Sequence, residues 1–207
     1  MALFYQQNIN EITRLAIWKI EEPEDFYLQK VPDNPSVLHP HKRLQHLAGR
    51  YLLQHLFADF PYTEMVIADT RKPYLPYEQY HFSISHCGDY AAAIVSKNER
   101  VGIDIEIPTV KVLKVAGKFL SNEELVKFQW ANTNIQLATI LWCAKEAMYK
   151  WWGWGAVDFK EMLRLHAFEP VTAGSTFKAR FAHPKIEEEL VMQYRIFEGL
   201  CLCWTHK

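Results

Sequence analysis

The chain has 207 residues, of which 49% are hydrophobic and 23% are charged, an ordinary balance for a soluble globular protein. A formal net charge of −1 excludes a general binder of nucleic acid or of anionic membranes, because such proteins are basic overall. The chain shows no signal peptide and no apolar run of ~18 residues, and its four cysteines form no C-x-x-C pair, so we expect a reduced, cytoplasmic protein without a membrane span.

The first half of the chain is predicted to combine short strands with one long helix. Apolar residues recur at helical spacing over 41–58, and alternating apolar residues on both sides of the turn Cys87-Gly88-Asp89 predict a β-hairpin. In chain order we expect a strand over 12–20, a proline-rich loop with a short helix over 21–40, a helix over 41–58, a short strand over 65–68, a loop over 71–76, and strands over 81–86 and 90–96.

The second half opens with a strand over 101–107, which ends at Pro108. Helical patterns follow, and the chain ends in alternating segments typical of strands. The expected helices cover 110–120, 121–130 and 134–152, and the expected strands cover 159–165, 175–181, 190–197 and 200–205. Strand pairs and long helices without regular βαβ alternation indicate an α+β fold.

Two carboxylates interrupt the apolar strand predicted over 101–107. Asp104 and Glu106 are two residues apart, so their side chains point to the same face of the strand. Neighbouring carboxylates repel each other unless a cation lies between them. The stretch is therefore either a solvent-facing acidic edge or part of a site for a metal ion or another cation.

A second charged group lies on the helix predicted over 134–152. Trp142, Glu146 and Lys150 are spaced by four residues and share one helical face, with Lys145 beside them. Glu146 and Lys150 alone are typical of an ordinary surface pair. An acid flanked by lysines on an aromatic-rich helix also suits an anionic ligand held by Mg²⁺, which binds carboxylates and substrate phosphates together.

Three further positions have both a structural and a functional interpretation. Ser121-Asn-Glu-Glu124 matches a capping box, so Glu124 either closes a helix N-terminus or serves as a general base. Ser85 and His86 end a predicted strand, where they are structural polar residues or phosphate ligands. Arg71 and Lys72 place two cations on a rigid loop before Pro73.

Taken together, these motifs resemble the signatures of the 4′-phosphopantetheinyl transferases. Gly102-Ile-Asp-Ile-Glu106 resembles the family's G-[IV]-D-[IV]-E motif, and Trp142-Cys-Ala-Lys-Glu-Ala-Met-Tyr-Lys150 resembles W-x-x-K-E-[AS]-x-x-K. Three weaker matches occur in the expected order: Lys72-Pro73 with G-K-P, Phe82-Ser-Ile-Ser-His86 with F-N-x-S-H, and Leu120-Ser-Asn-Glu-Glu124 with F-S-x-x-E. The lengths on both sides are similar to those of the surfactin-synthetase-type members.

The resemblance implies a monomer of two similar α+β lobes, a pseudo-dimer with the active site at the lobe interface. The lobes would comprise residues 1–100, with elements that bind coenzyme A phosphates, and 101–207, with the metal-binding and catalytic motifs. It also implies the reaction: the 4′-phosphopantetheine arm of coenzyme A moves to a serine of an apo acyl or peptidyl carrier protein, and adenosine 3′,5′-bisphosphate is released.

The resemblance further implies a role for each matching residue. Asp104, Glu106 and Glu146 would hold Mg²⁺ against the coenzyme A pyrophosphate. Lys150 would bind the coenzyme and stabilise charge on the departing nucleotide, and Glu146, or Glu124 through a water molecule, would accept the serine proton. The other coenzyme-binding residues would be Lys72, Arg71, Ser85, His86 and Lys145.

Three departures from the family motifs leave these implied metal ligands intact. Arg71 replaces a glycine, Ser83 an asparagine and Cys87 a serine or threonine. Lys30, Lys42 and Arg43 are candidates for the basic N-terminal residues that grip the nucleotide in relatives. Two alternatives stay open at this point: a non-catalytic module that binds coenzyme A or carrier protein, and a Mg²⁺-dependent hydrolase of a pyrophosphate compound.

Overall fold

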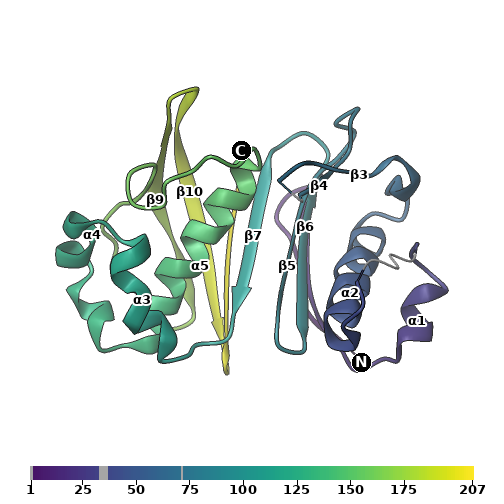
Figure 1. The fold of residues 1–207 in the computed structure, drawn as a ribbon, viewed down its shortest axis with the longest axis horizontal. Helices are drawn as coiled ribbons and strands as arrows, with labels where there is room; N and C mark the ends of the chain where they lie inside the picture. The colour runs from purple at the N-terminus through teal and green to yellow at the C-terminus, as the bar shows by residue number, and fades with distance from the viewer. Residues whose placement is uncertain (1, 33–36, 71) are drawn as a thin grey trace. The chain divides into compact units, whose positions relative to one another are not determined.

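The computed structural model describes residues 2–32, 37–70 and 72–207, so Arg71 lies outside the described residues. The chain divides into two compact units, Met1–Val101 and Gly102–Lys207. Each unit contains a sheet and helices of its own (Figure 1). Each also has its own hydrophobic core. The α+β class predicted from the sequence is confirmed.

The first unit is a four-stranded sheet covered by one long helix. The strand order is β1-β2-β6-β5, all neighbours are antiparallel, and α2 packs against β2, β5 and β6. A two-stranded sheet joins β3 to β4. The elements are β1 (Leu3–Asn8), β2 (Thr13–Lys19), α1 (Glu24–Leu28), α2 (Pro40–Leu56), the 3-10 helix η1 (Tyr62–Glu64), β3 (Val66–Ile67), β4 (Pro73–Tyr74), β5 (His81–Cys87) and β6 (Tyr90–Ser96).

Helix α2 owes its position to its start signals and its apolar face. His39 is the N-cap, its side chain accepts from the Lys42 amide, and Pro40 occupies the first turn, where its missing N–H costs nothing. Leu47, Leu52 and Leu53 are fully or almost fully buried in the core of this unit. The opposite side of the helix is left with polar residues.

The second unit is a five-stranded sheet in the order β7-β11-β10-β9-β8, so β7 and β8 form its two edges. The long helix α5 packs against β11, β10 and β8. The elements are β7 (Val101–Glu106), α3 (Lys111–Phe119), α4 (Asn122–Lys127), the 3-10 helix η2 (Gln129–Asn132), α5 (Ile135–Trp152), β8 (Leu163–Leu165), β9 (Gly174–His183), β10 (Ile186–Phe197) and β11 (Leu200–His206).

Gly102 allows α5 to lie directly against β7. A Cβ atom on Gly102 would lie 2.0 Å from the Ala147 carbonyl oxygen and 2.7 Å from the Trp151 backbone nitrogen, distances at which backbone would have to move. Helix α5 is fixed at both ends: the Asn134 side chain accepts from the Leu137 amide, and Gly153 ends the helix at φ 76°. This close approach brings the acids of β7 beside the charged face of α5.

Most of the expected elements are present within a few residues of their predicted ends, including the β5–β6 hairpin and the Ser121 capping box. Strand β1 was not predicted, because its residues are mostly exposed or half-buried and carry no strong apolar alternation. In the part of the chain that the structure describes, no helix has the length and apolarity that a membrane crossing requires.

Candidate functional site

The acids of β7 face the charged side of α5. Asp104 is only 3% exposed, and its Oδ1 accepts a hydrogen bond from Lys150 Nζ at 2.6 Å. Glu106 Oε1 accepts from Trp142 Nε1 at 2.9 Å. The two ends of the predicted Trp142–Glu146–Lys150 face therefore each hold one carboxylate of the strand.

Glu146 lies between these two contacts along the helix and interacts with both carboxylates. Burial, followed by repulsion from Asp104, raises the pKa of Glu146 to about 7, and Glu106 adds to the rise while Lys150 opposes it. Burial would lower the pKa of Lys150, but the negative charges of Asp104 and Glu146 hold it above the ordinary value. The structure thus brings together three mutually repelling acids and one lysine.

The chemistry of these donors fits a hard divalent cation, because Mg²⁺ prefers carboxylate oxygens and a carboxylate cluster repels itself without a cation. The described residues contain no group of three His, Cys, Asp or Glu side chains already arranged around a metal position. Lys150 and Trp142 occupy one oxygen each of Asp104 and Glu106. A metal ion held here would bind carboxylates that also contact these two side chains.

Glu124 and Lys145 form a separate pair inside the core. Their side chains are 1% and 0% exposed, and Lys145 Nζ donates to Glu124 Oε2 at 2.7 Å and to the carbonyls of Phe119 and Phe159, both at 2.8 Å. Burial lowers the pKa of Lys145 to about 8, although Glu124 opposes the shift. All three hydrogens of a protonated Lys145 ammonium are used, so this side chain has none left for a ligand, and we assign it to holding the fold.

The Glu124 carboxylate is equally occupied. It accepts from the backbone of Ser121 at 2.9 Å and from the amide of Leu165 at 2.9 Å, in addition to Lys145. The capping interpretation of Glu124 thus describes its contacts, and the structure does not bring it into the group formed by Asp104, Glu106, Glu146 and Lys150.

In the first unit, the candidate phosphate ligands lie at the end of β5 and before β4. Ser85 is buried, His86 is exposed at the hairpin turn, and Lys72 is half-buried next to Pro73. Helix α2 lies over β5, and its Gln45 side chain donates to the Gly88 carbonyl of the hairpin turn at 2.7 Å. The hairpin and the helix therefore present polar residues side by side.

Helix α2 adds cations to this region that the sequence analysis largely missed. Burial, and then the positive charges of Arg50, His86 and Arg43, lower the pKa of His46 to about 4. His46 is also hydrogen-bonded to Arg50, which is only 9% exposed. Four basic side chains are thus gathered on α2 and β5.

A signal for this group was present in the sequence. Arg43, His46 and Arg50 follow the i, i+3, i+7 spacing of one helical face, a pattern of charge rather than of apolar residues. Of the basic residues proposed earlier, Arg43 belongs to the group and also donates to Glu24 at 2.7 Å. Lys30 instead lies over the Phe26 ring, and Lys42 is exposed.

Comparison with known families identifies the superfamily of this chain. The profile of the 4′-phosphopantetheinyl transferase superfamily matches residues 100–204, which include β7 and α5 with all of their charged residues. The chain belongs to this superfamily. The match covers the second unit almost entirely.

Curated relatives of the superfamily extend the similarity. The chain is 31% identical to a putative 4′-phosphopantetheinyl transferase of Haemophilus influenzae over 68% of this chain and 63% of the relative. It is 32% identical to enterobactin synthase component D of Salmonella typhi over 53% of this chain and 47% of the relative, and 32% identical to the 4′-phosphopantetheinyl transferase AcpT of Escherichia coli K12 over 53% and 57%. The chain thus spans from about half to less than two thirds of these relatives' lengths.

Proposed function

We propose that the chain transfers the 4′-phosphopantetheine arm of coenzyme A to a serine of an apo carrier protein, with Mg²⁺ as the metal ion. The observation that carries this proposal is the convergence of Asp104, Glu106, Glu146 and Lys150 between β7 and α5, in a chain of this superfamily. Phosphoryl transfer depends on positioning and charge neutralisation, and such a group supplies both.

Asp104, Glu106 and Glu146 are the residues that would hold Mg²⁺. The ion supplies Lewis acidity, which polarises phosphoryl oxygens and steadies the leaving group. Because Asp104 is almost completely buried, its carboxylate is held in one orientation and loses little freedom on binding a cation.

Lys150 carries the positive charge that the departing adenosine 3′,5′-bisphosphate requires. Its ammonium is three-quarters buried, where a charge interacts more strongly with a phosphate than it does in water. Glu146 is our choice for the group that accepts the serine proton, because the Glu124 carboxylate already accepts from Ser121, Leu165 and Lys145.

The coenzyme phosphates are assigned to the basic group of the first unit. His86 and Ser85 on β5, with Lys72, supply hydrogen-bond donors, and Arg43 and Arg50 of α2 supply permanent charge. His46 is neutral at pH 7 and can donate a hydrogen bond without adding charge. Lys145 is left out of this set because its hydrogens are used in the core.

The test is release of adenosine 3′,5′-bisphosphate from coenzyme A with Mg²⁺, with and without an apo carrier protein. Release that requires the carrier, with a matching mass increase of the carrier, supports transfer. Release without the carrier supports hydrolysis instead, and no release with any member of a panel of carriers supports a binding module. The same panel identifies which carrier the protein modifies.

The metal assignment predicts a specific loss. Asp104→Asn should reduce transfer by at least about a hundredfold, because it removes a charged metal ligand while preserving side-chain size. Glu169→Ala, which removes an exposed carboxylate of the same unit, is the matched control and should keep normal activity. A folded Asp104→Asn protein that transfers at the normal rate would exclude Asp104 as a metal ligand.

A further inference from the structure

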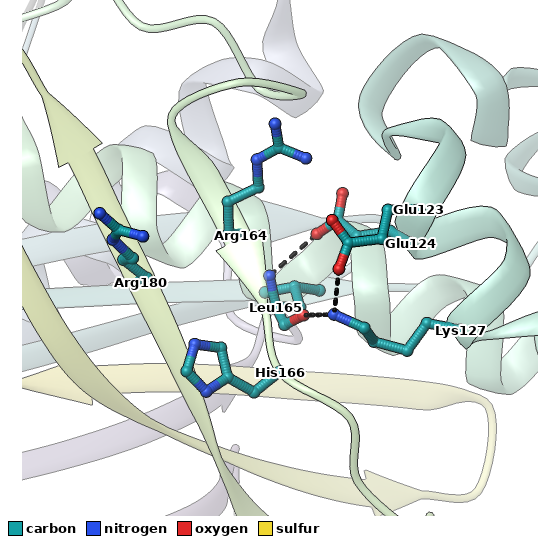
Figure 2. Close-up of a pocket in the computed structure, with 7 residues that line it drawn as sticks. All are labelled: Glu123, Glu124, Lys127, Arg164, Leu165, His166 and Arg180. Carbon is teal, nitrogen blue, oxygen red and sulfur yellow. Dashed lines mark hydrogen bonds and ion pairs between the residues drawn. The ribbon is translucent and has the colours of Figure 1, made fainter.

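A charged pocket lies at the opposite edge of the second unit's sheet from Asp104. It has a volume of about 330 Å³ and forms where α4 meets the edge strand β8 and its neighbour β9 (Figure 2). Asp104 lies on β7, the other edge strand of the same five-stranded sheet. The pocket is therefore distinct from the carboxylate group described above.

Strand alternation sends the Arg164 side chain of β8 toward this pocket. Leu163 and Leu165 are completely buried in the core, so Arg164 between them points to the other face. Arg164 is paired directly with Arg180 of β9, and both line the pocket. Like charges placed opposite each other on neighbouring strands repel, and an anion between them would remove that cost.

Two more nitrogen-bearing side chains complete the basic lining. Lys127 approaches from the end of α4, where its Nζ donates to the Leu165 carbonyl at 3.4 Å, and His166 lies on the strand side (Figure 2). Arg164, Arg180 and Lys127 together carry three permanent positive charges. Helix α4, edge strand β8 and strand β9 thus each contribute one permanently charged side chain.

Two acids line the pocket and offset part of this charge. Glu124 is already neutralised by Lys145 in the core, and Glu123, which is 76% exposed, lies 3.4 Å from Lys127. Arg164 and Arg180 are paired with Glu161 and Glu187, which are 67% and 62% exposed and do not line the pocket. Exposed pairs of this kind are weak, so a ligand that bridges both arginines can replace them.

We propose that this pocket binds the dianionic phosphate group of a small molecule. Guanidinium groups bind phosphate through paired hydrogen bonds, and a phosphate monoester carries about −1.5 to −2 charges at neutral pH, which suits three surrounding cations better than a single carboxylate does. The volume lies at the lower end of the range for small-molecule sites, roughly 300–1,000 Å³, which allows a phosphate with a short organic substituent.

The experiment is calorimetric titration of inorganic phosphate into the full chain, in a chelator so that no divalent cation contributes. Arg164→Gln and Arg180→Gln should each weaken binding by about tenfold or more, because each removes a charge-assisted pair of hydrogen bonds. Lys185→Gln, which changes an exposed lysine in the turn between β9 and β10 outside the pocket, is the matched control and should bind within about twofold of the unmodified chain.

Absence of phosphate binding by the unmodified chain, or unchanged binding by both arginine variants, would overturn the proposal. A parallel titration with glycerol 3-phosphate distinguishes the sources: tighter binding than inorganic phosphate assigns the pocket to a monoester, and equal or weaker binding assigns it to free phosphate. Since neither titration measures pantetheine transfer, failure here is distinguishable from failure of the proposed function.

Discussion

In the proposed site, the Lys150 ammonium and a divalent cation would neutralise the same carboxylate, that of Asp104. The ammonium lies 2.6 Å from Oδ1 of a carboxylate that is nearly excluded from solvent, so it already supplies the positive charge that the acids require. A metal ion that binds Asp104 would take over part of this neutralisation. The Lys150 ammonium would then have more of its charge left for a phosphate, which links the two halves of the proposed chemistry.

We predict that Lys150→Met binds Mg²⁺ more tightly than the unmodified chain, by about tenfold, in the absence of coenzyme A. Without the ammonium, Asp104 and Glu146 repel each other more strongly, and a cation relieves that repulsion. The rise in melting temperature on adding Mg²⁺ should therefore be larger in the variant. An equal or smaller rise would show that Lys150 does not compete with the metal ion.

His46 couples the stability of the first unit to pH. Its pKa of about 4 in the folded chain lies below the value of 6.5 expected in an unfolded chain, so the unfolded state binds more protons between these values. Its contribution is complete above pH 6.5 and is lost as pH falls toward 4, with a total on the order of 1–3 kcal/mol.

Substituting His46 isolates this effect. His46→Gln should flatten the pH dependence of the free energy of unfolding between pH 6.5 and 4, as measured by urea denaturation across that range. His39→Gln is the control: His39 is exposed at the N-cap of the same helix, and glutamine keeps a side-chain acceptor for the Lys42 amide. Parallel curves for His46→Gln and the unmodified chain would contradict the assignment.

At the scale of elements, the distance between β7 and α5 depends on the absence of one side chain. We predict that Gly102→Ala destabilises the chain by several kcal/mol, since a methyl group 2.0 Å from the Ala147 carbonyl forces the strand and helix apart. Gly117→Ala in α3 is the control, because a Cβ atom added there would meet no neighbouring atom within 4 Å. This substitution should raise the free energy of unfolding by about 0.4–1 kcal/mol. Chemical denaturation of both variants measures the difference.

The pair Glu124–Lys145 joins α4 to α5, and Glu124 also accepts from the Leu165 amide of β8. Lys145→Met alone should cost about 3–5 kcal/mol, because it leaves a buried carboxylate without its cation. Adding Glu124→Gln should recover much of that loss, because the buried charge is then removed. A simple sum of the two single effects in urea denaturation would argue against coupling.

The double variant also separates the two glutamates as proton acceptors. If Glu124 only holds the fold, a folded Glu124→Gln, Lys145→Met protein should keep measurable transfer and the pH profile of the unmodified chain. If Glu124 accepts the serine proton, activity should vanish even though stability is recovered.

For the whole molecule, local patterns in the sequence predicted most of the fold. Apolar periodicity and turn residues located the β5–β6 hairpin and helices α2 and α5, because those signals come from the segments themselves. Strand β1 escaped notice because it is a sheet edge with little buried surface. Its pairing with β2 depends on tertiary contacts rather than on its own composition.

The grouping of the candidate site residues was predictable where they share one strand or one helix face, as for Asp104 with Glu106 and Glu146 with Lys150. The occupation of Lys145 was not, because its acceptors, the carbonyls of Phe119 and Phe159, are 26 and 14 residues away along the chain. Every residue carries a backbone carbonyl, so the sequence does not show which carbonyl a buried lysine contacts. A lysine in a signature motif therefore looks the same whether it binds a ligand or a core carbonyl.

The Trp142–Glu106 hydrogen bond links the fluorescence of Trp142 to the position of a proposed metal ligand. The indole donates directly to a proposed metal ligand and stacks near Phe159, with ring centroids 5.9 Å apart. Any cation that draws Glu106 away changes the polarity around this indole, and with it the wavelength and intensity of its fluorescence. Occupancy of the carboxylate group can thus be followed without a label, by subtracting the signal of a Trp142→Phe variant.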